Sequence, residues 1–189
     1  MTVRPDRWLL AGYAGIAGFG VLEGTLRGPD AAASLRAESA DDGTTRALAA
    51  AYAASALAAP FLRTLPPRLP TAVRPVGVGL QLAGLGLRAW AMQTLRESYT
   101  RTLRVSNTQG VIEAGPYFRI RHPGYLGSLL IWMGFALSSG SALVLGWVMA
   151  LILPIYVRRM EAEETLLSEQ LRHYDEYQAR TKRLIPSAW

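Results

Sequence analysis

Thirteen residues at positions 115–127 hold most of the side chains in this chain that could carry out chemistry. They include two arginines, a histidine and two tyrosines, namely Arg119, Arg121, His122, Tyr117 and Tyr125. An apolar stretch long enough to enter a bilayer follows directly. Polar and ionisable groups at a membrane boundary raise the free energy, so they usually bind a ligand or react. The segment therefore predicts a functional site, and its residue types are typical of an enzyme.

The pair His122-Pro123 predicts where a helix begins. Proline disfavours the helical conformation for the residue before it, so His122 is expected to be extended. Pro123 suits the first turn of a helix, where an N–H group has no intrahelical partner. A helix that starts here presents free N–H groups and a positive dipole end, which favour an anion such as a carboxylate. His122 and Tyr125 flank this point and can supply hydrogen bonds or a stacking face.

Arg159 and Glu163 form a second candidate pair, just after the last apolar block. They are four residues apart, so they share one face of a helix. Glu163 and its neighbour Glu164 point about 100° apart on that helix, so both cannot address one ligand equally. The alternative is a surface ion pair that stabilises the protein by less than about 1 kcal/mol. Their position beside the 115–127 segment favours a site.

Composition excludes several kinds of site. The chain has no Cys, which excludes disulfides, thiolate metal ligands and Cys nucleophiles. Its two histidines, His122 and His173, lack the spacing of a zinc site, so we expect no metal. The net charge of +6 comes from basic residues clustered around the apolar blocks, which indicates contact with anionic membrane lipids rather than nucleic acid.

The elements that must position these side chains appear as five apolar blocks, at 8–26, 47–62, 73–95, 125–137 and 142–157. A helix needs about 20 residues to span a bilayer core, and about 17 is near the lower limit. The first and third blocks are long enough, the second and fifth are marginal, and the fourth is short. Only residues 138–141 separate the last two, so we expect a tight helical hairpin there. The pattern predicts an all-α integral membrane protein with about five transmembrane helices.

Small residues within the blocks predict close helix packing. In a membrane, helices associate by packing, and glycine lets two backbones approach closely. The glycines to which we assign this role rather than a ligand role are Gly12, Gly15, Gly18 and Gly20 in the first block and Gly77, Gly79, Gly84 and Gly86 in the third.

The distribution of Lys and Arg predicts the orientation. One side of the blocks, which includes the 115–127 segment and the C-terminal tail, holds fourteen of the 20 basic residues; the other holds five, and Arg88 lies within the third block. The positive-inside rule places the segment and the tail in the cytoplasm. In the tail, residues 158–178 combine dense charge with an apolar stripe and predict a cytoplasmic amphipathic helix. Residues 181–189 are expected to be extended and to pack back on the bundle.

Three motifs resemble one known family. The 115–127 segment reads GPY-x-x-x-RHP-x-Y-x-G; R-x-x-x-E-E-x-x-L follows from Arg159, and Y-x-x-Y-x-x-R-T-x-R-L-I-P from Tyr174. Together they resemble the isoprenylcysteine carboxyl methyltransferase family of integral-membrane enzymes, over roughly residues 85–186. The element RHP-x-Y-x-G alone also resembles membrane sterol and steroid reductases. The GPY lead and the two later motifs favour the methyltransferases.

The resemblance implies methyl transfer from S-adenosylmethionine, which leaves S-adenosylhomocysteine, in a membrane-embedded fold. The family's arginine that addresses the substrate carboxylate falls on Arg159, the expected catalytic residue. Gln109 stands where the family usually has His. The family's cofactor contacts fall on Gln109, Gly110, Val111, Ile112, Tyr117, His122, Pro123, Gly124, Tyr125 and Glu163.

The chemistry of these residues fits that cofactor. Glu163 suits its ammonium group, the helix start at Pro123 suits its carboxylate, and the tyrosines suit a cationic or aromatic surface. A carboxylate that is aligned and stripped of water attacks a methyl group without a general base, so orientation and electrostatic placement supply the rate. Arg159 is then expected to position the attacking oxygen by a charge-assisted hydrogen bond. His122 is expected to orient the cofactor rather than to act as a base.

We therefore expect a carboxyl O-methyltransferase with a lipophilic or lipid-like acceptor, in the bacterial inner membrane with its site facing the cytoplasm. It is expected to form one structural domain, in which residues 1–72 give two membrane helices and residues 73–189 give the methyltransferase core. Three alternatives stay open: an NADPH-dependent oxidoreductase of the sterol reductase type, a phospholipid N-methyltransferase, and a non-catalytic membrane protein whose tail helix docks a partner.

Overall fold

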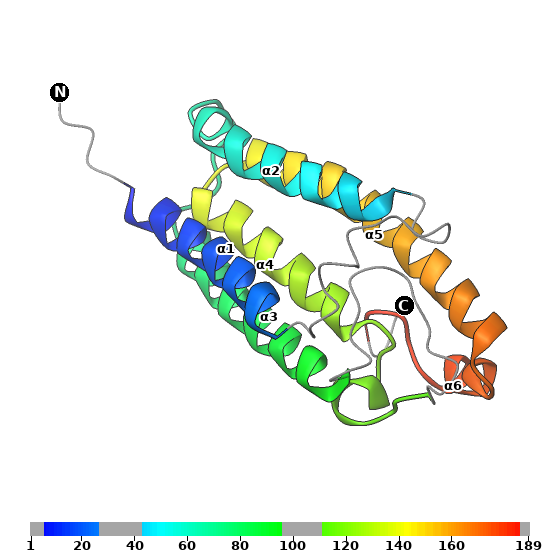
Figure 1. The fold of residues 1–189 in the computed structure, drawn as a ribbon. Helices are drawn as coiled ribbons and strands as arrows, with labels where there is room; N and C mark the ends of the chain where they lie inside the picture. Colours follow the sequence, from blue (N-terminus) through cyan, green and yellow to red (C-terminus); the bar gives the residue numbers. More distant parts are fainter. Residues whose placement is uncertain (1–5, 27–42, 96–110, 186–189) are drawn as a thin grey trace.

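The computed structural model describes residues 6–26, 43–95 and 111–185. Each of the five apolar blocks forms one long helix, so the predicted all-α architecture is confirmed for the described residues (Figure 1). In chain order the elements are α1 (Arg7–Thr25), α2 (Thr44–Leu62), α3 (Val73–Leu95), the 3-10 helix η4 (Gly115–Phe118), α4 (Pro123–Ser139), α5 (Ala142–Gln170) and α6 (Tyr174–Arg180).

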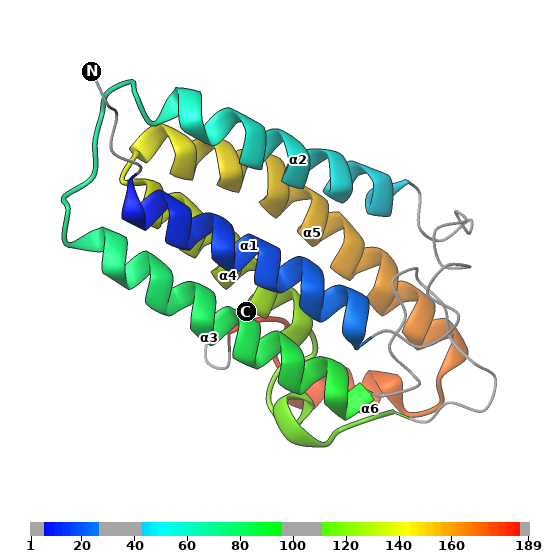
Figure 2. The ribbon, with the colours of Figure 1, turned by 60° about the vertical axis from the view of Figure 1, so that its left-hand side comes forward.

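Helix α4 lies at the centre of the bundle. Figures 1 and 2 show α1 and α3 on one side of it, and α2 and α5 run side by side as a second pair. The predicted hairpin of α4 and α5 is present. Gly140 ends α4 in a left-handed conformation (φ 71°), and the hydroxyl of Ser141 accepts a hydrogen bond from the N–H of Val144 at 3.4 Å. The hairpin returns the chain, so the start of α4 and the charged end of α5 lie at one end of the bundle.

Glycines bring α3 and α4 into backbone contact. A Cβ atom added at Gly84 would lie 2.5 Å from the carbonyl oxygen of Gly127, and one at Gly77 would lie 2.6 Å from that of Gly134. Side chains larger than hydrogen would push these helices apart, as the packing role predicts. On α1, Gly12 and Gly15 make similarly close approaches, whereas no described atom lies within 4 Å of a Cβ built at Gly20, Gly79 or Gly86.

Asp6 links three helices at the end of the bundle that lies opposite the charged part of α5. Its carboxylate caps α1 by accepting a hydrogen bond from the N–H of Trp8 at 3.0 Å. It also binds the guanidinium groups of Arg63 and Arg74. Three helix ends are thereby tied together, and two of the five basic residues on this side of the blocks are paired with an acid.

The charged tail does not form one helix over 158–178, and that prediction is wrong. Helix α5 runs without a break from the apolar block to Gln170, and α6 begins at Tyr174. Between them Leu171 is extended and His173 is left-handed (φ 65°). The break turns α6 back toward the bundle and lets a small apolar cluster form, which consists of Leu171, Tyr174 and Tyr177 with Val111 and Leu167 packed against them.

Within the described residues, one helix is long and apolar enough to cross a membrane by length and composition, and it is α5. Helix α4 has 17 residues, close to the lower limit for a span. Helices α1, α2 and α3 are longer, but Ala and Gly replace many of the larger apolar residues in them. The five helices are thus found, while their number of membrane crossings stays a prediction.

Candidate active site

The candidate site forms where the start of α4 meets the charged end of α5. Pro123 is the first residue of α4, and His122 before it has a non-helical conformation (φ −122°, ψ 55°), as proline requires, although it is not fully extended. Residues 158–170 carry α5 about 20 Å beyond its apolar part, at about 1.5 Å per residue. These turns place charged side chains beside the start of α4.

The phenol of Tyr125 joins the two helices. Its hydroxyl donates a hydrogen bond to Oε2 of Glu163 at 2.8 Å and accepts one from Nε of Arg159 at 2.9 Å. Arg159 and Glu163 share a face of α5, so a single side chain on α4 reaches both. Arg159 is 5% exposed, whereas Glu163 is only half-buried. The predicted catalytic arginine and the predicted cofactor carboxylate therefore lie in one hydrogen-bonded chain.

His122 lies between the two neighbouring glutamates. Its Nε2 is 2.9 Å from Oε1 of Glu164, and its Nδ1 is 3.9 Å from Oε2 of Glu163. A carboxylate only accepts hydrogen bonds, so Nε2 carries the proton of this contact. The imidazole is buried, and its centroid is 5.4 Å from that of the Tyr125 ring. One site therefore includes both the start of α4 and Glu163, and Glu164 shares His122 with it while binding further partners of its own.

Glu164 binds basic side chains from both the segment before α4 and the C-terminal tail. It is 4% exposed, and its carboxylate accepts hydrogen bonds from Nε of Arg121 at 2.8 Å and from Nη2 of Arg183 at 2.6 Å. Gln178 donates to the same carboxylate at 3.3 Å. With His122, four side chains from two separate segments converge on this one residue. Glu164 thus connects α5, the segment before α4 and the C-terminal tail.

The backbone of the tail pairs with the segment just before α4. The N–H of Arg121 donates to the carbonyl of Lys182 at 2.8 Å, and the N–H of His122 donates to that of Arg183 at 3.1 Å. Leu184 is buried in the main apolar core. The predicted extended end that packs back on the bundle is confirmed as far as residue 185.

Tyr177 of α6 holds the segment Gly115-Pro116-Tyr117 by a hydrogen bond to its backbone. Its hydroxyl donates a hydrogen bond to the carbonyl oxygen of Tyr117 at 2.7 Å. Burial raises the pKa of the Tyr177 phenol to about 12, so it keeps its proton for this bond at neutral pH. Val111 packs on the same tail cluster. Two of the predicted cofactor residues, Val111 and Tyr117, are therefore positioned by the tail.

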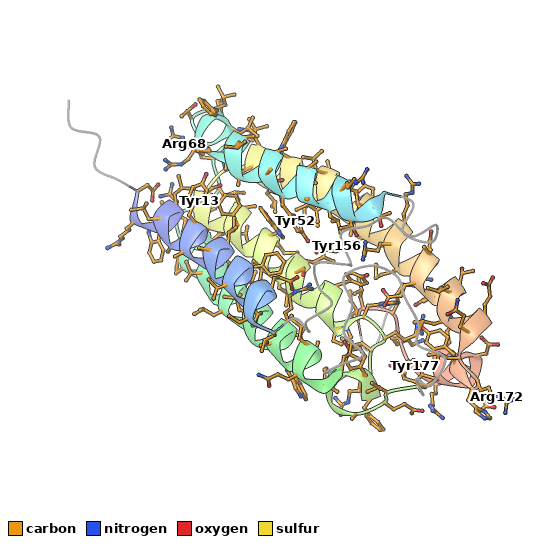
Figure 3. All side chains as sticks on the ribbon, in the orientation of Figure 1. Tyr13, Tyr52, Arg68, Tyr156, Arg172 and Tyr177 are labelled. Atoms are coloured by element: carbon orange, nitrogen blue, oxygen red, sulfur yellow. The ribbon has the colours of Figure 1, made fainter. Side chains whose placement is uncertain are left out.

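A row of aromatic rings leads from the site into the bundle. The centroid of the Tyr125 ring is 5.1 Å from that of Tyr156, and the hydroxyls of Tyr156 and Tyr52 are hydrogen-bonded. The Tyr52 ring stacks on Trp132 at 4.7 Å. Figure 3 shows Tyr52 and Tyr156 inside the bundle, with Tyr177 at the end near α6.

Arg88 of α3 braces the first turn of α4. Its Nε donates to Oε1 of Glu23 on α1 at 2.6 Å, and its Nη1 donates to the carbonyl of Gly124 at 2.7 Å and to the hydroxyl of Ser128 at 2.6 Å. A buried charge is stable only when it is paired and hydrogen-bonded, and Arg88 meets both conditions. Helices α1 and α3 thereby hold the backbone of Gly124, another predicted cofactor residue.

The structure brings most, but not all, of the predicted site residues together. His122, Tyr125, Arg159 and Glu163 share direct contacts, and Pro123 and Gly124 form the helix turn beside them. Val111 and Tyr117 lie against the tail, and Ile112 is half-buried in the segment before η4. Gln109 and Gly110 lie outside the described residues.

Several residues of this arrangement are absent from the site that the sequence predicts. Arg121 and Arg183 belong to the first and third motifs. The only sequence signal for their pairing with Glu164 is that these motifs contain several arginines. Arg88 gives a stronger signal, because an arginine within an apolar block usually has a buried partner. Among the described residues, Glu23, which pairs with Arg88, and Thr44 and Thr45, which bond Arg159, give no local signal in the sequence.

The phospholipid methyltransferase family model matches residues 73–173, just over half of the 189 residues. The matched region includes α3, η4, α4 and α5, and with them Tyr125, Arg159 and Glu163. No match to a curated protein was found.

Proposed function

The chain belongs to the phospholipid methyltransferase family, in the same integral-membrane methyltransferase group as the isoprenylcysteine carboxyl methyltransferases, and we propose that it methylates the carboxylate of a lipophilic acceptor. The methyl donor in this proposal is S-adenosylmethionine. The observation that carries it is the chain of hydrogen bonds from Arg159 through Tyr125 to Glu163. In this chain the guanidinium of Arg159 is available to an anionic methyl acceptor. The carboxylate of Glu163, close to it, is available to the cationic methyl donor.

The donor set of this site fits S-adenosylmethionine. That cofactor supplies an electrophilic methyl group on a sulfonium, together with an ammonium, a carboxylate and an adenine. The half-buried carboxylate of Glu163 suits the ammonium, and the first turn of α4, from Pro123, suits the carboxylate. We assign the remaining binding contacts to Tyr117, His122, Gly124 and Tyr125 and to the preceding residues Gln109, Gly110, Val111 and Ile112.

Arg159 suits the acceptor because of its charge and its burial. A carboxylate needs no general base for methyl transfer, so the protein's task is to align it and to exclude water. A buried guanidinium makes strong hydrogen bonds to a carboxylate, often two in parallel. His122 already shares its Nε2 proton with Glu164, which supports an orienting role rather than that of a base.

Methylation of a lipid amine is the second candidate, because the matching family is described as phospholipid methyltransferases. An ammonium must lose a proton before it can attack a methyl group, so this reaction requires a proton acceptor. Glu163 is the half-buried carboxylate of the site and would then serve the acceptor instead of the cofactor. The match to a methyltransferase family favours both of these candidates over an NADPH-dependent reductase.

Transfer of a labelled methyl group distinguishes the two candidates. Purified protein in detergent micelles is incubated with methyl-labelled S-adenosylmethionine and either palmitate or phosphatidylethanolamine. We expect label in the palmitate fraction that mild base releases as methanol, because esters are hydrolysed and N-methyl groups are not. Base-stable label in phosphatidylethanolamine would establish the amine reaction. Absence of cofactor binding by folded protein would contradict both.

The same preparation tests the cofactor role of Glu163. Hydrogen bonds to charged groups contribute about 1.5–3 kcal/mol, so Glu163→Ala is expected to weaken S-adenosylmethionine binding about 10- to 100-fold, as measured by calorimetry. Glu161→Ala is the matched control, since that exposed residue lies on the same helix half a turn away.

We propose further that all five long helices are embedded in the membrane. Large apolar side chains cover outer faces of the bundle, such as Leu57 at 71% exposed and Leu82 at 65%, while the polar Ser55 and Gln81 are buried inside. The distribution of basic residues supports a cytoplasmic site in a bacterial inner membrane, and the pairing of Arg63 and Arg74 with Asp6 removes part of the opposing charge.

Single cysteines test this placement, because the chain has none of its own. In native membranes, Leu57→Cys and Leu82→Cys are expected to resist a water-soluble maleimide, although both positions are exposed on the protein. Figure 3 shows Arg68 and Arg172 at opposite ends of the bundle. We expect Arg68→Cys to react in intact cells and Arg172→Cys only after lysis. Equal labelling at all four positions would contradict the proposal.

A further inference from the structure

The first turn of α2 reaches the guanidinium of Arg159. Nη1 of Arg159 donates hydrogen bonds to the hydroxyl of Thr44 at 3.0 Å and to that of Thr45 at 2.8 Å. Thr44 is 6% exposed and Arg159 is 5% exposed, so these contacts are shielded from water. The threonines are 115 and 114 residues away from Arg159 in the chain, and they lie outside the region that matches the family.

Local structure fixes the two hydroxyls in place. Gly43 precedes α2 in a left-handed conformation (φ 73°), and Thr44 and Thr45 are the first two residues of the helix. Their β-branched side chains have few allowed rotamers. Helix α2 itself is held along α5, where the hydroxyls of Tyr52 and Tyr156 are hydrogen-bonded. The acceptors of the Arg159 hydrogen bonds therefore belong to a rigid element.

These contacts determine the orientation of the guanidinium. The group is planar and rigid, so fixing Nε on Tyr125 and Nη1 on the threonines also fixes the direction of Nη2. Hydroxyl groups accept these hydrogen bonds without adding negative charge beside Arg159.

We propose that Thr44 and Thr45 are positioning residues, which hold Arg159 in the orientation that receives the anionic end of the methyl acceptor. The inference rests on the proposed role of Arg159 in the reaction. It gives α2 a part in catalysis in addition to packing, because this helix supplies two contacts of the catalytic arginine.

The test removes both hydroxyls at nearly constant shape. The Thr44→Val/Thr45→Val variant is compared with wild type for methyl transfer to palmitate, or to phosphatidylethanolamine if wild type methylates that probe instead. We expect kcat for the acceptor to fall about 10- to 100-fold, since small misplacements of a positioning group cause losses of this size. The affinity for S-adenosylmethionine is expected to stay within a factor of about three of wild type, because hydrogen bonds of other residues determine it.

Two further variants separate positioning from folding. Thr44→Ser/Thr45→Ser restores both hydroxyls and is expected to recover most of the lost kcat. Thr64→Val is the matched control, because Thr64 follows the other end of α2 and its hydroxyl bonds only a nearby carbonyl among the described contacts. If the double valine variant does not fold, Thr45→Val alone is measured, since Thr45 is only half-buried.

The outcomes separate this inference from the proposed function. A wild-type enzyme that methylates a probe together with a valine variant of equal kcat would overturn the positioning role alone. Failure of the serine variant to recover activity would also overturn it. A wild-type protein that binds S-adenosylmethionine but methylates neither probe would overturn the proposed acceptor chemistry, and the role of the threonines with it.

Discussion

Replacing Glu164 with alanine will release the C-terminal tail and disable the site. The carboxylate is buried and accepts hydrogen bonds from Arg121, His122 and Arg183. Its removal leaves the buried His122 and two partly buried arginines without the negative charge that they share. Breaking a buried ion pair by deleting one partner costs about 3–5 kcal/mol, and here three partners are affected. We expect a strong fall in the unfolding temperature and loss of S-adenosylmethionine binding.

Hydrogen exchange measures the release directly. In the Glu164→Ala variant, the amides of residues 174–185 are expected to exchange faster than in wild type, because the Glu164 carboxylate binds Gln178 and Arg183 of this segment. Glu169→Ala, an exposed residue of the same helix, serves as the control and should leave exchange unchanged. Wild-type protection of the tail in Glu164→Ala would show that the backbone pairing with residues 119–122 holds it without the carboxylate.

The helices are largely predictable because a lipid-facing or buried helix needs a continuous apolar run. The block 73–95 and helix α3 have the same bounds. Helix α2 starts three residues before its block, because polar Thr44, Thr45 and Arg46 do not register as apolar although they are helical. The break after Gln170 depends on burial of Leu171 against residues far away in the chain, so no local pattern predicts it.

The site is predictable where its geometry is local. The proline rule fixes the start of α4 at Pro123, and the four-residue spacing places Arg159 and Glu163 on one face. The role of Glu164 as the partner of Arg183 is not predictable, because it depends on how the distant C-terminal tail packs against α5. Likewise, Thr44 meets Arg159 only because α2 packs along α5, which is a contact between distant segments.

Replacing Arg159 with lysine is expected to suppress methyl transfer while leaving cofactor binding nearly intact. Lysine keeps the positive charge but lacks the planar fork of donors, so it cannot bond Tyr125, the threonines and an acceptor in one fixed plane. Loss of one preorganised donor at a reacting group lowers kcat by about 10²- to 10³-fold. The affinity for S-adenosylmethionine should change little, because Glu163 keeps its hydrogen bond from Tyr125.

The matched control for Arg159→Lys is the same substitution at Arg158. It tests whether the effect is limited to the face of α5 that carries Glu163. Arg158 is the adjacent residue, so it points about 100° away from Arg159 on the helix, and it is exposed. Arg158→Lys is expected to retain wild-type kcat for whichever probe the enzyme methylates. Equal losses in both variants would mean that the basic charge of this turn, and not the held guanidinium, serves the acceptor. A kcat of Arg159→Lys near wild type, with calorimetry showing weaker cofactor binding instead, would place Arg159 on the cofactor and leave the acceptor to another group.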